Sequence, residues 1–98
     1  MKIEEAAKRG AKALDKTNPL WYQDVDINRL DLADGEYCIL GQLNGSYYDA
    51  GGYIKDLDPY DESPKALAFK LGFNSRRDSA FPSLTMAWIK EIFKRRQA

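Results

Sequence analysis

Residues 36–48 read Glu-Tyr-Cys-Ile-Leu-Gly-Gln-Leu-Asn-Gly-Ser-Tyr-Tyr, and after the first glutamate this stretch carries no charge. Charged residues make up 31% of the whole chain, so an uncharged run of this length indicates burial. Its apolar side chains fall on one face of a helix, namely Ile39, Leu40, Leu43 and Tyr47. Asp34 would then be the N-cap. The stretch therefore predicts a central helix over 35–47, with the rest of the chain packed around it.

The same stretch also contains a signal for a β-hairpin. Asn44-Gly45 is a strong two-residue turn sequence between two apolar runs. However, residues 38–40 are consecutive apolar residues, which do not alternate as in a half-buried strand, and Gly41 would weaken a strand. The helix is the preferred interpretation, and an α+β fold with a central hairpin is the alternative.

Further segments have the pattern of helices. Residues 3–16 are amphipathic, with acidic residues early and a lysine last. Residues 64–71 follow a capping Ser63 and end at Gly72. Residues 82–96 carry an apolar stripe and end in three cations, which suit the negative end of the helix dipole.

The predicted fold is therefore mostly α: a single small globular domain over 1–98, of about four helices with an irregular Asp-rich middle. Residues 49–63 are rich in glycine and aspartate and are predicted to be a polar loop. The expected core consists of large apolar side chains: Leu14, Trp21, Ile27, Leu30, Leu32, Ile39, Leu40, Leu43, Leu67, Leu71, Leu84, Trp88 and Ile92.

The composition of the chain argues against several classes of function. Fifteen basic residues balance fifteen acidic ones (Lys+Arg 15, Asp+Glu 15), so no global charge draws the chain to nucleic acid or membrane. A single cysteine and the absence of histidine remove a disulfide framework and the commonest zinc ligands, so neither metal nor cofactor is expected. The sequence has no transmembrane run and no signal-peptide core. A soluble protein of the host cytoplasm is expected.

Catalysis finds little support in the residues. Without histidine, a general base would have to be a carboxylate, a lysine or Cys38. Cys38 stands in the most apolar run, where a thiol packs as a small hydrophobe and reacts slowly. No serine has an identifiable base partner, so the chain is not expected to be an enzyme.

A DNA-binding alternative arises from the C-terminal third. Leu71-Gly72-Phe73, followed by a basic helix, is similar to the second half of the helix-turn-helix in AraC-type regulators. The match departs from that pattern in two ways, since the gap to Phe81 is longer and Pro82 stands where the following helix should run. An ordinary helix pair is therefore preferred.

Short motifs occur in order along nearly the whole chain: Arg9-Gly10-Ala11, Pro19-x-Trp21, Asp26-Ile27, Cys38-Ile39-Leu40-Gly41-Gln42-Leu43, Leu71-Gly72-Phe73 and Leu84-Thr85-x-Ala87-Trp88. Together they resemble a family of small uncharacterised proteins of actinobacterial phages and prophages, and the Cys-aliphatic-Leu-Gly-Gln-Leu segment is the most specific part. The resemblance implies a phage accessory protein, in counter-defence or host takeover, and no particular chemistry.

Stoichiometric binding of a host protein or a small anionic ligand is therefore the first functional expectation. A DNA-binding regulator acting through the basic C-terminal third is the alternative hypothesis, and a small enzyme is the least favoured hypothesis. An anion would meet Arg76, Arg77 or the start of the last helix. Tyr47, Tyr48 and Tyr53 could supply a stacking surface for a base or a partner side chain.

Overall fold

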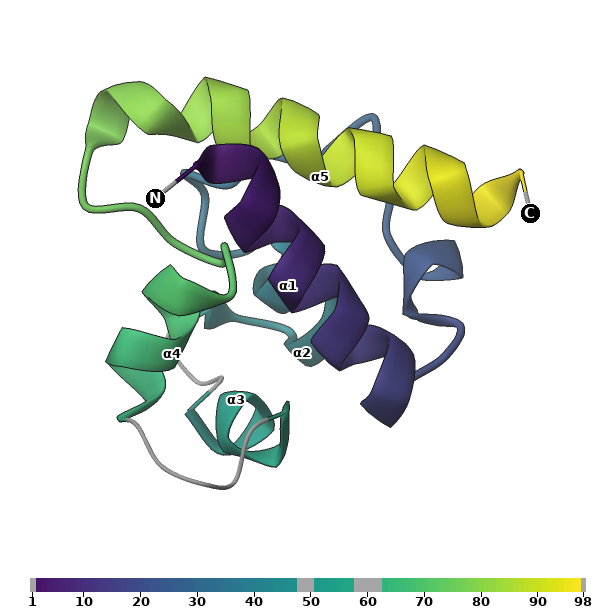
Figure 1. Cartoon of the computed structure of the whole chain (residues 1–98), viewed down its shortest axis with the longest axis horizontal. Helices are drawn as coiled ribbons and strands as arrows, with labels where there is room; N and C mark the ends of the chain where they lie inside the picture. Colours follow the sequence, from purple (N-terminus) through teal and green to yellow (C-terminus); the bar gives the residue numbers. More distant parts are fainter. Residues whose placement is uncertain (1, 48–50, 58–62, 98) are drawn as a thin grey trace.

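The computed structural model describes residues 2–47, 51–57 and 63–97, and these residues form helices and turns without any strand (Figure 1). The helices are α1 (Ile3–Thr17), α2 (Ile39–Asn44), α3 (Gly51–Leu57), α4 (Pro64–Lys70) and α5 (Phe81–Arg96), with short 3-10 turns at Trp21–Gln23 and Asp78–Ala80. The predicted mostly α fold is confirmed. No helix within the described ranges is both long and apolar enough to cross a bilayer.

The crossing of α1 and α5 forms the centre of the molecule (Figure 1). Trp88 of α5 is fully buried and stacks on Phe73, with ring centroids 5.3 Å apart, while Trp21 meets it edge-on at 5.6 Å. Its indole N–H donates to the carbonyl of Gly72 at 2.6 Å. Gly10 of α1 faces the same ring, and a Cβ there would collide with it. The two helices approach this closely because Gly10 has no side chain.

The predicted central helix over 35–47 is too long. The structure has only the six-residue α2, which begins after Cys38 and ends where Gly45 adopts a φ of 92°. Because Gly45 terminates a helix in this left-handed conformation, the hairpin alternative is wrong. The apolar run is nevertheless buried, since Ile39 and Leu40 are fully enclosed in the core.

The N-cap of α2 is Cys38 and not Asp34. The N–H of Gly41 donates to the Cys38 sulfur at 3.2 Å. Asp34 instead stabilises the turn before the helix, where its carboxylate accepts the N–H of Glu36 at 2.8 Å. This turn folds back against the helix start, because Gly41 lacks the Cβ that would collide with the Gly35 and Glu36 backbone.

The predicted polar loop over 49–63 contains a helix, α3, so the structure has five α-helices in its described part where four were predicted. Only Ile54 of α3 is buried. Such a short helix is stabilised by tertiary packing and not by its own propensity, so it shows little periodicity in the sequence.

The predicted core is largely confirmed. Ile27 and Leu43 are only half-buried against it, while the other predicted residues are buried. Val25, Ile54 and Phe73 are buried core residues that the prediction did not include.

Candidate functional site

A hollow of about 460 Å³ lies where the starts of α1 and α5 meet the loop between α4 and α5. Its volume falls within the range of small-molecule sites. It is lined by Lys2, Ile3, Ala6, Phe69, Asn74, Ser75, Arg76, Arg77, Ala80 and Leu84. We call it the arginine hollow. No acidic side chain is among these lining residues.

The loop carrying the two arginines is firmly anchored. Gly72, at a φ of 74°, lies so close to the α1 backbone that a Cβ would strike Ala6. The N–H groups of Phe73 and Asn74 both donate to the carbonyl of Ala68, at 2.8 and 3.2 Å. These contacts place the following residues at a defined position before any ligand arrives, which reduces the entropy cost of binding.

Local side-chain bonds order the tip of this loop. The Asn74 amide donates to the hydroxyl of Tyr47 at 2.7 Å, and its oxygen accepts the N–H of Ser75 at 2.7 Å. The Ser75 hydroxyl in turn accepts the N–H of Arg77 at 3.2 Å. Arg76 lies over the ring of Phe69, with its guanidinium carbon 4.3 Å from the ring centroid. Both arginines remain exposed.

The electrostatics of the arginine hollow favour anions. Lys2, before α1, and the adjacent Arg76 and Arg77, in the loop between α4 and α5, contribute positive charge from two segments of the chain. The helices α1 and α5 both begin at this hollow, and neither has a side-chain N-cap hydrogen bond. Helix N-termini carry partial positive charge, which adds to that of the side chains.

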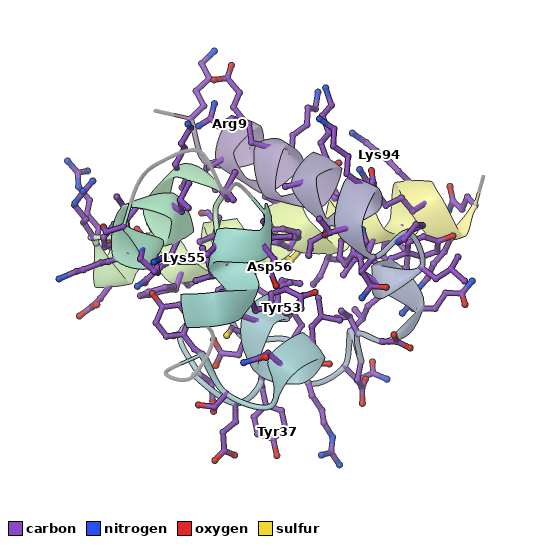
Figure 2. All side chains as sticks on the ribbon, turned by 90° about the horizontal axis from the view of Figure 1, so that it is seen from below. Arg9, Tyr37, Tyr53, Lys55, Asp56 and Lys94 are labelled. Atoms are coloured by element: carbon purple, nitrogen blue, oxygen red, sulfur yellow. The ribbon has the colours of Figure 1, made fainter. Side chains whose placement is uncertain are left out.

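The structure brings together only part of the predicted site. Arg76 and Arg77 line the hollow. Tyr47 contacts it indirectly, because its hydroxyl accepts a hydrogen bond from the lining residue Asn74. Tyr53 lies on α3 beside Lys55 and Asp56 (Figure 2), does not line the hollow, and has a buried hydroxyl without a hydrogen-bond partner. Tyr53 is therefore not part of the arginine hollow, while Tyr48 lies outside the described residues.

Sequence reasoning missed Lys2 and Phe69 as site residues. Lys2 is far from the arginines in the chain and reaches the hollow only because α1 packs under α5. An aromatic residue seven positions before an arginine is too common to indicate a stack between them.

The last cations of α5 serve the fold. The Arg95 guanidinium forms a two-pronged pair with Asp15, at 2.9 and 2.8 Å, and also contacts the Glu91 carboxylate at 3.0 Å. Arg96 donates to the carbonyls of Tyr22 and Val25. Beyond complementing the helix dipole, these arginines tie α5 to α1 and to the segment after the first 3-10 turn.

This network shifts the ionisation of its members. The hydrogen bonds from Arg95 hold the pKa of Asp15 below its ordinary value of 3.8, although partial burial acts in the opposite direction. The same hydrogen bond raises the pKa of Arg95. Trp21 also donates its indole N–H to the Asp15 carboxylate, at 2.9 Å.

The connection between α4 and α5 differs from that of a helix-turn-helix. Residues 71–80 separate the two helices and include a 3-10 turn, whereas the motif has a turn of about three or four residues. Two of the C-terminal arginines, Arg95 and Arg96, are also engaged internally. Both features weigh against DNA binding through this part of the chain.

Cys38 has the environment expected of a structural thiol. It is 1% exposed, and burial raises the pKa of its thiol. A raised pKa lowers the fraction of thiolate, which is the reactive form. Within the described ranges, no three His, Cys, Asp or Glu side chains group as metal ligands.

The outer face of α5 carries an apolar stripe. Met86 is 55% and Phe93 48% exposed, and the half-buried Ile89 lies between them at helical spacing. Lys90 and Lys94 flank the stripe on one side, and Lys94 points outward from the molecule (Figure 2). We call these residues the outer stripe.

The fold is thus a small helical domain that carries the arginine hollow and the outer stripe. Both features come from the geometry of the chain itself. Comparison with protein-family models, with curated proteins and with solved structures finds no match.

Proposed function

We propose that the protein acts by stoichiometric binding, and that the arginine hollow holds a small anionic ligand without transforming it. The observation that carries the proposal is the convergence of Lys2, Arg76 and Arg77 on one hollow whose lining includes no acidic side chain. Fixed cations in a concave site attract anions more strongly than cations scattered over a convex surface.

The absence of a reactive pair around the hollow supports binding without turnover. Ser75 is the hydroxyl in its lining, and it accepts a backbone N–H from Arg77. None of the lining residues is a carboxylate or thiol that could act as its base. The geometry favours a ligand that is held and released unchanged.

The family resemblance supplies the biological setting of the proposal. A phage accessory protein can interfere with its host by sequestering a signalling molecule, and this needs affinity and not catalysis. The resemblance supports a role in counter-defence or host takeover inside the host cell. It does not identify the ligand.

Titration calorimetry at low ionic strength tests the proposal, with inorganic pyrophosphate and adenosine monophosphate as probes. We expect saturable binding to the native protein, and loss of binding in the Arg76→Glu/Arg77→Glu variant. The matched control is Lys12→Glu/Lys16→Glu, which makes the same charge change at exposed sites on α1 away from the hollow. The control should bind as the native protein does.

Phosphorus NMR of the same mixtures tests the claim that nothing is transformed. Each probe should be recovered unchanged after prolonged incubation. Equal loss of affinity in both charge-reversal variants would reduce the effect to net charge. Absence of saturable binding, or conversion of either probe, would overturn the proposal.

A host protein is the second candidate target, and the outer stripe favours it. An exposed Met and Phe on one helix face are typical of contact surfaces, because both residues are enriched in interfaces. The flanking Lys90 and Lys94 suit a partner with acidic residues beside its apolar contact. Pull-down from host lysate with the native protein and with Phe93→Glu tests this candidate. A specific partner lost in the variant supports it, and an identical set of captured proteins contradicts it.

A further inference from the structure

A second hollow, of about 420 Å³, adjoins the arginine hollow. It is lined by Ser63, Lys65, Ala66, Phe69 and Arg76 at the start of α4. Phe69 and Arg76 line both hollows, so the two adjoin at the Arg76–Phe69 contact. Each hollow also has a cation of its own: Lys65 on one side, and Arg77 with Lys2 on the other.

The stack between the hollows has a property of its own. The guanidinium carbon of Arg76 lies 4.3 Å from the centroid of the Phe69 ring, while the residue as a whole is exposed. An exposed guanidinium is planar and cationic, so it can stack on a second ring. Nucleobases stack on arginine planes of this kind, whereas a lysine offers only a point charge.

Resting on the function proposed above, we infer that the two hollows form one elongated site for a ligand with two phosphate groups flanking a nucleobase. The base stacks on Arg76, one phosphate meets Arg77 and Lys2, and the other meets Lys65. A short, phosphorylated dinucleotide has this chemistry. The same chemistry occurs at the end of a single strand of nucleic acid.

Calorimetry with the 5′-phosphorylated dinucleotide of adenosine (pApA) and with adenosine monophosphate tests this inference. We expect the dinucleotide to bind about tenfold more tightly, because it gains a second charge-assisted contact. Lys65→Glu should remove this advantage and leave the affinity for the monophosphate unchanged. Lys12→Glu is the matched control and should alter neither affinity.

Arg76→Lys tests the stacking part of the inference, because it keeps the charge and removes the planar group. It should lower the affinity for both nucleotides by a larger factor than the affinity for inorganic pyrophosphate, which needs the charge and not the plane. Equal affinity of native protein for both nucleotides, with Lys65→Glu indistinguishable from Lys12→Glu, would overturn the inference and leave the proposed anion site standing. Failure of every phosphate probe to bind would overturn both.

A deoxyadenosine 12-mer distinguishes the two sources of this chemistry. An affinity no higher than that of the dinucleotide assigns the site to a free small molecule. An affinity that increases with strand length, and falls steeply with added salt, assigns it to single-stranded nucleic acid. Either result supports a site for two phosphates around a base.

Discussion

The α1–α5 crossing and the segment 24–38 are packed against the same core by different means. At the crossing, apolar side chains recur at helical spacing and one glycine lies among them. Trp88 is completely buried there. The segment 24–38 contains no α-helix; it places four side chains in the core and is held by backbone turns and by hydrogen bonds from side chains to the backbone. The α1–α5 crossing depends on close packing of side chains, whereas the segment 24–38 depends more on hydrogen bonds made by individual polar groups.

The polar bonds of the segment follow one local rule. Asp26, Asp31 and Asp34 each accept the N–H of the residue two positions later, at 2.8–3.0 Å. Such aspartate turns stabilise backbone that no helix or sheet supports. Gln42 of α2 then fixes the segment, since its amide bonds the N–H and carbonyl of Asp26 and the carbonyl of Tyr37.

Gly10→Ala should have the largest effect on stability. The added Cβ would collide with the Trp88 ring and with the carbonyl of Leu71, so the two central helices would have to separate. We expect a loss of about 4 kcal/mol or more, measured by urea unfolding, which threatens the fold of a domain of this size. Gly52→Ala is the control, because the site in α3 is open and alanine favours helix. Similar stabilities of the two variants would contradict the close crossing.

Leu40→Ala should destabilise the protein by about 2–5 kcal/mol, since it leaves a cavity in the centre of the core. Leu40 is 0% exposed and lies on the short helix α2, which connects the two regions. Leu43→Ala, at a half-buried position on the same helix, should cost less. Chemical unfolding of both variants measures the difference, and a reversed order would show that α2 packs through another face.

Gln42→Ala tests the polar region and should cost about 1–3 kcal/mol, because three backbone groups lose their partner. Asn44→Ala, at an exposed position two residues later, is the control. Hydrogen exchange should show faster exchange at Asp26 in the Gln42 variant, while amides of α1 and α5 keep their protection. A uniform change across the chain would contradict separate stabilisation of the segment.

The smallest effect is expected from Asp15→Asn, and it depends on pH. Folding lowers the pKa of Asp15. The pairing with Arg95 therefore stabilises the native state fully when the pH is above the ordinary carboxyl pKa of 3.8. This contribution is lost as pH falls through the lowered pKa. Native protein should therefore be more stable than the variant at neutral pH, and the difference should shrink in acid. Thermal unfolding between about pH 2 and pH 7 measures it, and a constant difference would show that the charge has no role.

This contrast explains which parts of the fold were predictable. The helices near 3–16, 64–71 and 82–96 repeat their apolar residues, and the second follows the Ser63 cap, so the sequence indicates them within a residue or two. The segment 35–38 and α3 depend on contacts with distant residues and have no repeat. The central helix was predicted too long because an uncharged run was taken for one continuous buried helix, whereas within it α2 covers only Ile39–Asn44.

The residues of the candidate site were likewise predictable only in part. Arg76 and Arg77 are adjacent in the chain and precede a helix, so they could be predicted as an anion site. Lys2, Lys65 and Phe69 join them only through packing of separate helices. Tyr53 was grouped with Tyr47 because the two are close in sequence, but Tyr53 lies on α3 and does not line the hollow.

The most direct test of the central claim is an NMR titration of the ¹⁵N-labelled protein with inorganic pyrophosphate. Binding in the arginine hollow predicts saturable shifts for the amides of residues 74–77 and for the first turns of α1 and α5. The far end of α5, around Lys94, should remain unchanged, and Arg76→Glu/Arg77→Glu should abolish the shifts without altering the rest of the spectrum. Shifts spread over all cationic surfaces, or the same shifts in that variant, would contradict the assignment of the hollow as an anion site.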